Sequence, residues 1–107
     1  MKPPPVRYFA RVHDLLSVPT WKRGSEWWSA IRQARDSVLE ILRGPIDPAV
    51  VAILHGPTVP THIAADPQWA ESVWSAALGE VEAWSARLDR AYLRYVTEQA
   101  LGLSGTA

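Results

Sequence analysis

The sequence predicts an all-α fold, a bundle of three to four helices built on a long C-terminal helix. Three observations indicate this. Apolar residues recur at helical spacing in several separate segments, proline and glycine mark the boundaries between those segments, and no stretch has the alternating pattern of a strand. At 107 residues the chain has the length of one domain, which we take to span 1–107.

The first half of the chain predicts two helices joined by a turn. Pro3, Pro4 and Pro5 should hold the start extended, because proline fixes one backbone dihedral angle. A helix over about 6–17 follows, with its apolar residues on one face: Val6, Phe9, Val12 and Leu16. The segment SVPTWKRG then predicts a turn or short helical hook around Trp21. Ser25 is a good N-cap for a second helix that runs to about Arg43, where Gly44 and Pro45 stop it.

The second half predicts a short helix and a long one, each announced by Asp-Pro. Asp47-Pro48 begins a helix over about 48–55 whose apolar residues surround it, so that we expect it to be buried or pinned under a larger element. The segment PTVPTHIAA predicts a loop. Asp66-Pro67 begins the last helix, which continues to about Leu101 and leaves a frayed tail over 102–107.

The last helix carries an apolar seam. Its members alternate steps of four and three residues, the spacing of packed helices: Ala70, Trp74, Ala77, Val81, Trp84, Leu88, Ala91 and Tyr95. Trp84 lies within this face and Trp74 at its margin. Gly79 falls outside the face and costs about 1 kcal/mol relative to alanine. Either another part of the molecule or a partner approaches the backbone there, or the helix breaks.

Six tryptophans are a heavy load for a chain of this length. Each aromatic side chain can bury on the order of 150–250 Å². They either line the core or remain exposed in the single chain and are covered by a copy or a partner. We expect Trp84 and one of Trp27 and Trp28 inside, and Trp69 and Trp74 at the edge of an interface that includes Arg94.

Two polar residues lie on apolar faces. Arg35 needs a carboxylate, a carbonyl or an aromatic ring to offset the loss of water. Either its head reaches the surface or stacks on Trp28, or it forms an ionic pin with an acid or holds an anionic ligand; Glu80 and Glu98 are the candidate internal partners. His13, between Phe9, Val12 and Leu16, is expected to be a core residue with one hydrogen bond.

Composition and motifs exclude several classes of function. The formal charge is zero, with 11 basic and 11 acidic residues, which argues against nucleic acid and anionic membranes as partners. The chain has no cysteine, no apolar run of the roughly 20 residues that span a bilayer, and no signal-peptide pattern, so that we expect a cytoplasmic protein. His55 and His62 lack the spacing of a helical metal pair, and we expect neither a metal nor another cofactor.

The sequence therefore favours a non-enzymatic interaction or assembly module that self-associates through an aromatic helix face. No nucleophile stands beside a base in a known pattern, so no catalytic residue is assigned. The alternative is a ligand-binding bundle or compact enzyme, in which aromatic walls and a few polar groups line a pocket between helices. That pocket would be formed by Trp28, Trp84, Arg35 and His13.

Overall fold

A computed structural model describes residues 6–55 and 60–102 and contains the predicted helices. They are α1 (Val6–Leu16), the 3-10 turn η1 (Thr20–Lys22), α2 (Ser25–Leu42), α3 (Pro48–His55), α4 (Thr61–Ala64) and α5 (Pro67–Ala100). The described part of the chain has no strand. The predicted all-α class with a long C-terminal helix is thus confirmed. The extended start over 1–5 and the tail over 103–107 lie outside the described residues.

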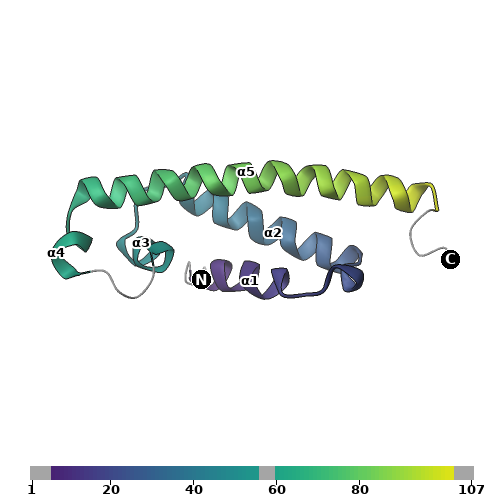
Figure 1. The fold of residues 1–107 in the computed structure, drawn as a ribbon, viewed down its shortest axis with the longest axis horizontal. Coiled ribbons are helices and arrows are strands. Elements are labelled where there is room, and N and C mark those ends of the chain that lie inside the picture. The colour runs from purple at the N-terminus through teal and green to yellow at the C-terminus, as the bar shows by residue number, and fades with distance from the viewer. Residues whose placement is uncertain (1–5, 56–59, 103–107) are drawn as a thin grey trace.

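The bundle is elongated and follows α5. This helix has 34 residues, which gives a length of roughly 51 Å at 1.5 Å per residue. The molecule measures 58 × 28 × 20 Å, and its radius of gyration of 16.8 Å exceeds the value of about 13 Å for a compact domain of this size. In Figure 1, α5 runs along one side and the other helices lie beneath it. Helices α2, α3 and α4 pack on α5, and α1 packs on α2.

The core consists of two clusters that lie one after the other along α2 and α5. The first contains Leu15, Trp27, Ile31, Ala34 and Leu88, and the second contains Val38, Leu42, Val50, Val51 and Trp74. Helix α2 supplies residues to both clusters, so it forms the middle layer between α1 and α5. Most of the predicted seam of α5 faces these clusters, but Ala91 is exposed.

The Asp-Pro signals work as the sequence predicts. The carboxylate of Asp47 accepts a hydrogen bond from the backbone N–H of Ala49, and that of Asp66 accepts one from Gln68, at 2.9 and 3.0 Å. The proline that follows each aspartate needs no hydrogen-bond acceptor in the first helical turn. Both helices therefore begin where the sequence places them.

Two structural expectations are wrong in detail. Ser25 is the first residue of α2, and Gly24 occupies the N-cap without a side-chain bond. The predicted loop after Pro57 contains the short helix α4. Of the two alternatives for Gly79, the break is wrong and the continuous helix is confirmed: α5 passes through this residue, and no atom of the described structure approaches within 4 Å of the place where a Cβ would lie.

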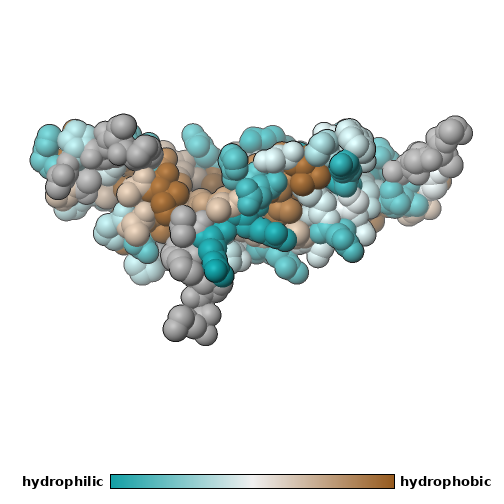
Figure 2. Space-filling view, turned by 90° about the horizontal axis from the view of Figure 1, so that it is seen from below, coloured by the Kyte–Doolittle hydropathy of each residue, from teal (hydrophilic) through white to brown (hydrophobic). Residues whose placement is uncertain are grey.

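Helix α3 is buried on one side only and packs under the longer helix α5, which is one of its two predicted arrangements. Val50 and Val51 are buried, whereas Ile53 is 39% exposed, since only one side of this helix meets the rest of the bundle. Figure 2, which views the molecule from the side opposite α5, shows apolar side chains gathered at the α3 end of this face.

Candidate interaction surface

Two tryptophans seal the two clusters and bind the ends of neighbouring helices. The indole Nε1–H of Trp27 donates to the carbonyl of Leu15 at 2.6 Å, and that of Trp74 donates to the carbonyl of Leu42 at 2.7 Å. Both carbonyls belong to the last turn of a helix, where no backbone N–H of the same helix can reach them. Trp27 is therefore the predicted inward member of its pair with Trp28.

The expectation that Trp74 lies at an interface edge is wrong for the single chain. Its side chain belongs to the second cluster, and the residue is 5% exposed. The helical position of Trp74 is marginal, as predicted, but the C-terminal end of α2 covers that margin and supplies a hydrogen-bond acceptor. Truncation of Trp74 should consequently reduce stability first.

A stack of aromatic rings joins the start of α2 to the end of α5. The ring centroids of Trp28 and Tyr95 are 5.5 Å apart at an interplanar angle of 26°, and Trp28 also lies 5.7 Å from Tyr92. The guanidinium of Arg32 lies over the ring of Tyr92, with its Cζ 4.0 Å from the ring centroid. This cation–π contact accounts for the position of a guanidinium whose buried Nε has no hydrogen-bond partner.

The remaining tryptophans of α5 are half-buried. Trp69 meets His55 of α3 edge-on, with 5.1 Å between the ring centroids, and Trp84, expected inside, packs at the border of the first cluster. The aromatic face of α5 is thus occupied by helices of the same chain. A self-association surface on that face would have to displace them.

Arg35 forms an ionic pin between α2 and α5. It is 6% exposed, donates from Nε to Asp36 at 2.7 Å and from Nη1 to Asp89 at 2.7 Å, and also reaches Ser85 at 3.0 Å. Loss of water would lower the pKa of the guanidinium, but the hydrogen bonds and charges of the two carboxylates outweigh this and raise the pKa.

The ionic pin is one of several alternatives that the sequence predicts for Arg35, but the predicted partners are wrong. The acids are Asp89 and Asp36 rather than Glu80 or Glu98, because the long guanidinium stem reaches past the apolar face to the polar border of α5. Arg35 already binds two carboxylates and a hydroxyl of its own chain, so its charge does not require an anionic ligand.

The four residues of the alternative pocket are not brought together. The side chain of His13 is 85% exposed and lies 3.9 Å from Asp14, so the expected core position is wrong. It points away from the packed face of α1 because Val12 and Leu15 already fill that face. An exposed histidine and a buried, fully paired Arg35 cannot line one cavity.

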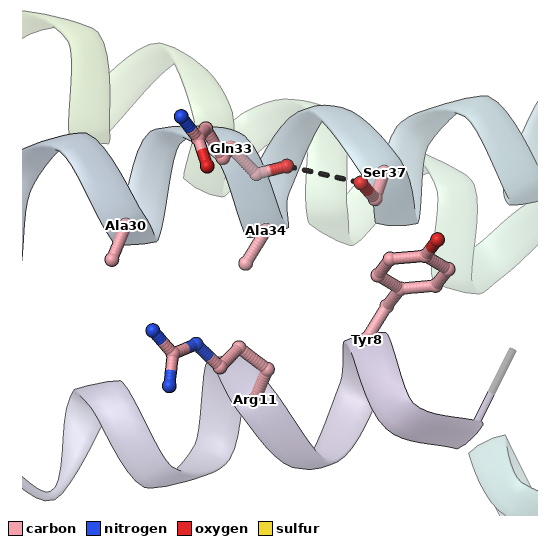
Figure 3. Close-up of a pocket in the computed structure, with 6 residues that line it drawn as sticks. All are labelled: Tyr8, Arg11, Ala30, Gln33, Ala34 and Ser37. Carbon is pink, nitrogen blue, oxygen red and sulfur yellow. Dashed lines mark hydrogen bonds between the residues drawn. The ribbon is translucent and has the colours of Figure 1, made fainter. Parts of the chain in front are cut away.

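Two surface depressions among the described residues lack convergent polar groups. Figure 3 shows one of about 200 Å³ between α1 and α2, where Tyr8 and Arg11 face the alanines Ala30 and Ala34. The hydroxyl of Ser37 is held by the backbone carbonyl of Gln33 at 3.1 Å, so it is turned to its own helix. A binding pocket needs several polar groups directed at one point.

A second depression, of about 430 Å³, lies where α3 meets the start of α5, between Ile46, Val51 and Ala70. Its lining is apolar except for Asp66, which already caps α5. In the described residues no group of three or more His, Asp or Glu side chains is placed to hold a metal ion.

Several large apolar side chains are exposed, and some of them lie towards the C-terminal end of α5. Trp21 on η1 is 80% exposed, and the turn that carries it is pinned by Arg23, whose guanidinium donates to the carbonyls of Val18 and Leu16. On α5, Leu93 is 66% exposed. Both were outside the predicted interface, which named Trp69, Trp74 and Arg94; of these three, only Arg94 is exposed.

Leu93 belongs to a stripe that runs along the side of α5 turned away from the other helices, which we name the outward face. All its members are exposed and they alternate steps of four and three residues: Ser72, Ala76, Gly79, Ala83, Ala86, Arg90, Leu93 and Thr97. Most are small. The spacing of this stripe is present in the sequence, but the predicted interface was placed on the aromatic seam, on the opposite side of the same helix.

Comparison of the chain with models of protein families, with curated proteins and with solved structures finds no match. Among the helices described here, none is both long and apolar enough to cross a membrane.

Proposed function

We propose that this protein is a non-enzymatic assembly module that self-associates through the outward face of α5. The observation that carries the proposal is that this face is exposed from Ser72 to Thr97 and includes a leucine, Leu93, that is 66% exposed. The bundle lies on the other side of the helix (Figure 1). The partner-binding side is therefore opposite to the aromatic side that the sequence suggested.

The spacing of the outward face supports a helix as the partner. Steps of four and three residues keep a stripe in contact with a second helix over several turns. Alanine favours helices, so exposed alanines alone need no partner. Gly79 is different, because glycine costs helix stability and nothing in the described structure approaches it.

Charge supports a second copy as that partner. The chain has a formal net charge of zero, so two copies do not repel each other at long range. A protein with no net charge also lacks the usual protection against association.

The size of the face predicts a weak dimer. From Ser72 to Thr97 the helix is roughly 39 Å long and about 10 Å wide, which gives a footprint on the order of 400 Å² per copy. A standard interface buries about 800 Å² per partner. We therefore expect a dissociation constant in the micromolar range, about 10 µM or weaker.

Sedimentation equilibrium across that concentration range tests the proposal. The wild-type protein should pass from monomer to dimer, and Leu93→Glu should raise the dissociation constant at least about tenfold, because two leucines leave the interface and two charges enter it. Leu16→Glu is the matched control, since Leu16 is also an exposed leucine, at 44%, but lies on α1. It should leave the dissociation constant unchanged.

A protein that stays monomeric at several hundred micromolar (about 500 µM) would contradict the proposal. So would a dimer that is weakened equally by the two substitutions. Native mass spectrometry of the same samples would reveal a retained small ligand, which is the outcome expected of the alternative, ligand-binding function.

A further inference from the structure

We propose that two copies pair through their α5 helices in antiparallel orientation, about a two-fold axis that passes between Trp84 and Ser85. This inference rests on the proposed function and specifies its geometry. Three properties of the described structure lead to it: the distribution of unpaired charge along α5, the order of large and small residues on the outward face, and a groove beside that face.

The charges of α5 are divided between its two halves. From Pro67 to Ala86 every charged residue is acidic, whereas the rest of the helix contains all three of its arginines, Arg87, Arg90 and Arg94, together with the acids Asp89 and Glu98. Two acids along the border with α2 are already paired, Glu82 with Arg43 at 3.2 Å and Asp89 with Arg35. Glu80 and Arg87, on the other border, form no ion pair with any residue the structure describes.

Antiparallel pairing satisfies these unpaired charges. It sets the acidic half of each copy against the half of the other that contains the arginines, and brings Glu80 next to Arg87 of the second copy, twice by symmetry. In a parallel pair the residues placed to meet Arg87 and Arg94 of the second copy would be Glu82 and Asp89. Those carboxylates already bind arginines of their own chain.

The order of residue sizes fits the same arrangement. The small residues Ala76 and Gly79 lie in the first half of the outward face, and the larger Arg90 and Leu93 lie in the second half. With the axis between Trp84 and Ser85, Leu93 faces Ala76 of the second copy and Arg90 faces its Gly79. Near the axis Ala83 faces Ala86, so that the backbones can approach closely there.

A groove of about 390 Å³ marks the central contact. It is lined by Glu80, Val81, Ala83, Trp84 and Arg87. Four of these residues follow the spacing i, i+3, i+4 and i+7, which is the set that forms a hole for a side chain of a facing helix. Its lining includes Ala83 of the outward face and the two unpaired charges.

A charge exchange tests the pairing. Glu80→Arg and Arg87→Glu, each alone, should raise the dissociation constant about tenfold, because two attractive rim contacts become two repulsive ones. The double variant should return it to within about threefold of the wild-type value, because the pairs are restored in reverse. Both positions are exposed, and the far-ultraviolet circular dichroism of all three variants should match that of the wild type.

Disulfide trapping provides the geometric test, since the natural chain has no cysteine. Ala76→Cys and Leu93→Cys proteins are mixed and oxidised. Antiparallel pairing predicts a disulfide between the two different variants. The two positions are about 25 Å apart along one helix, so a parallel pair would join only like variants.

Disulfides between like variants, or charge variants that dimerise as the wild type does, would overturn the antiparallel arrangement and leave self-association standing. A chain that remains monomeric in the sedimentation experiment would overturn both proposals.

Discussion

Replacement of Trp74 should destabilise the fold strongly, although Trp74 first looked like an interface residue. The residue is 5% exposed and its indole donates to the Leu42 carbonyl at 2.7 Å. Removal of a large aromatic side chain from a core costs about 3–5 kcal/mol. The buried carbonyl would also lose its only side-chain donor, which costs about 1–3 kcal/mol where no water can replace it. Trp74→Ala should therefore lower the free energy of unfolding by about 5 kcal/mol or more, the upper end of the first range.

Such a loss is a large part of the stability of a small domain, which is about 5–15 kcal/mol. Trp74→Phe provides a graded version, because it keeps most of the ring and removes the donor. We expect it to lower the free energy of unfolding by about 2 kcal/mol and the Tm by roughly 10 °C.

The assay is urea unfolding followed by circular dichroism, at a protein concentration low enough to keep the chain monomeric. Trp21→Ala is the matched control, because this tryptophan is 80% exposed and its loss should cost less than about 0.5 kcal/mol. If Trp74→Ala costs no more than the control, the burial of Trp74 and its bond to Leu42 are wrong.

Four further substitutions test other features of the fold. Gly79→Ala should raise the free energy of unfolding of the monomer by about 1 kcal/mol in the same assay, because a Cβ at this position meets no atom within 4 Å; a decrease would mean that the helix is packed there. Asp89→Ala should cost about 1–3 kcal/mol, because it leaves the buried Arg35 with one carboxylate, and Asp36→Ala combined with it should cost more than either alone. Arg23→Ala should cost about 1–2 kcal/mol through loss of the two bonds that pin the turn before α2, and limited proteolysis should then cut the chain near residue 20, whereas unchanged resistance would show that the turn is held by other contacts.

Local signals made the helices predictable. The pairs Asp47-Pro48 and Asp66-Pro67 combine a capping carboxylate with a residue that suits only the first helical turn, so they mark helix starts whatever the rest of the chain does. The apolar seam of α5 has a period that only a helix explains. These features depend on neighbours within four residues.

Contacts between helices were not predictable in the same way. The position of Trp74 on a helical wheel is marginal, and only the placement of the α2 C-terminus decides that it is buried. For Arg35 the sequence predicts an ionic pin only as one of several alternatives, and the length of its stem lets several acids of α5 compete for it. His13 was placed in the core because its neighbours are apolar, although the turn of the helix carries it to the solvent side.

The bonds from Trp27 and Trp74 to the last turns of α1 and α2 have a consequence for how the chain can vary. Each of these helices ends against an indole that comes from another part of the sequence. A residue inserted within α1 or α2, before its last turn, would rotate the terminal carbonyl about the helix axis and shift it along that axis, away from the indole N–H that binds it. A residue inserted after the last turn would only lengthen the connection to the next helix. Changes in length should therefore be tolerated in the turns and rejected within the two helices, even at positions that face water.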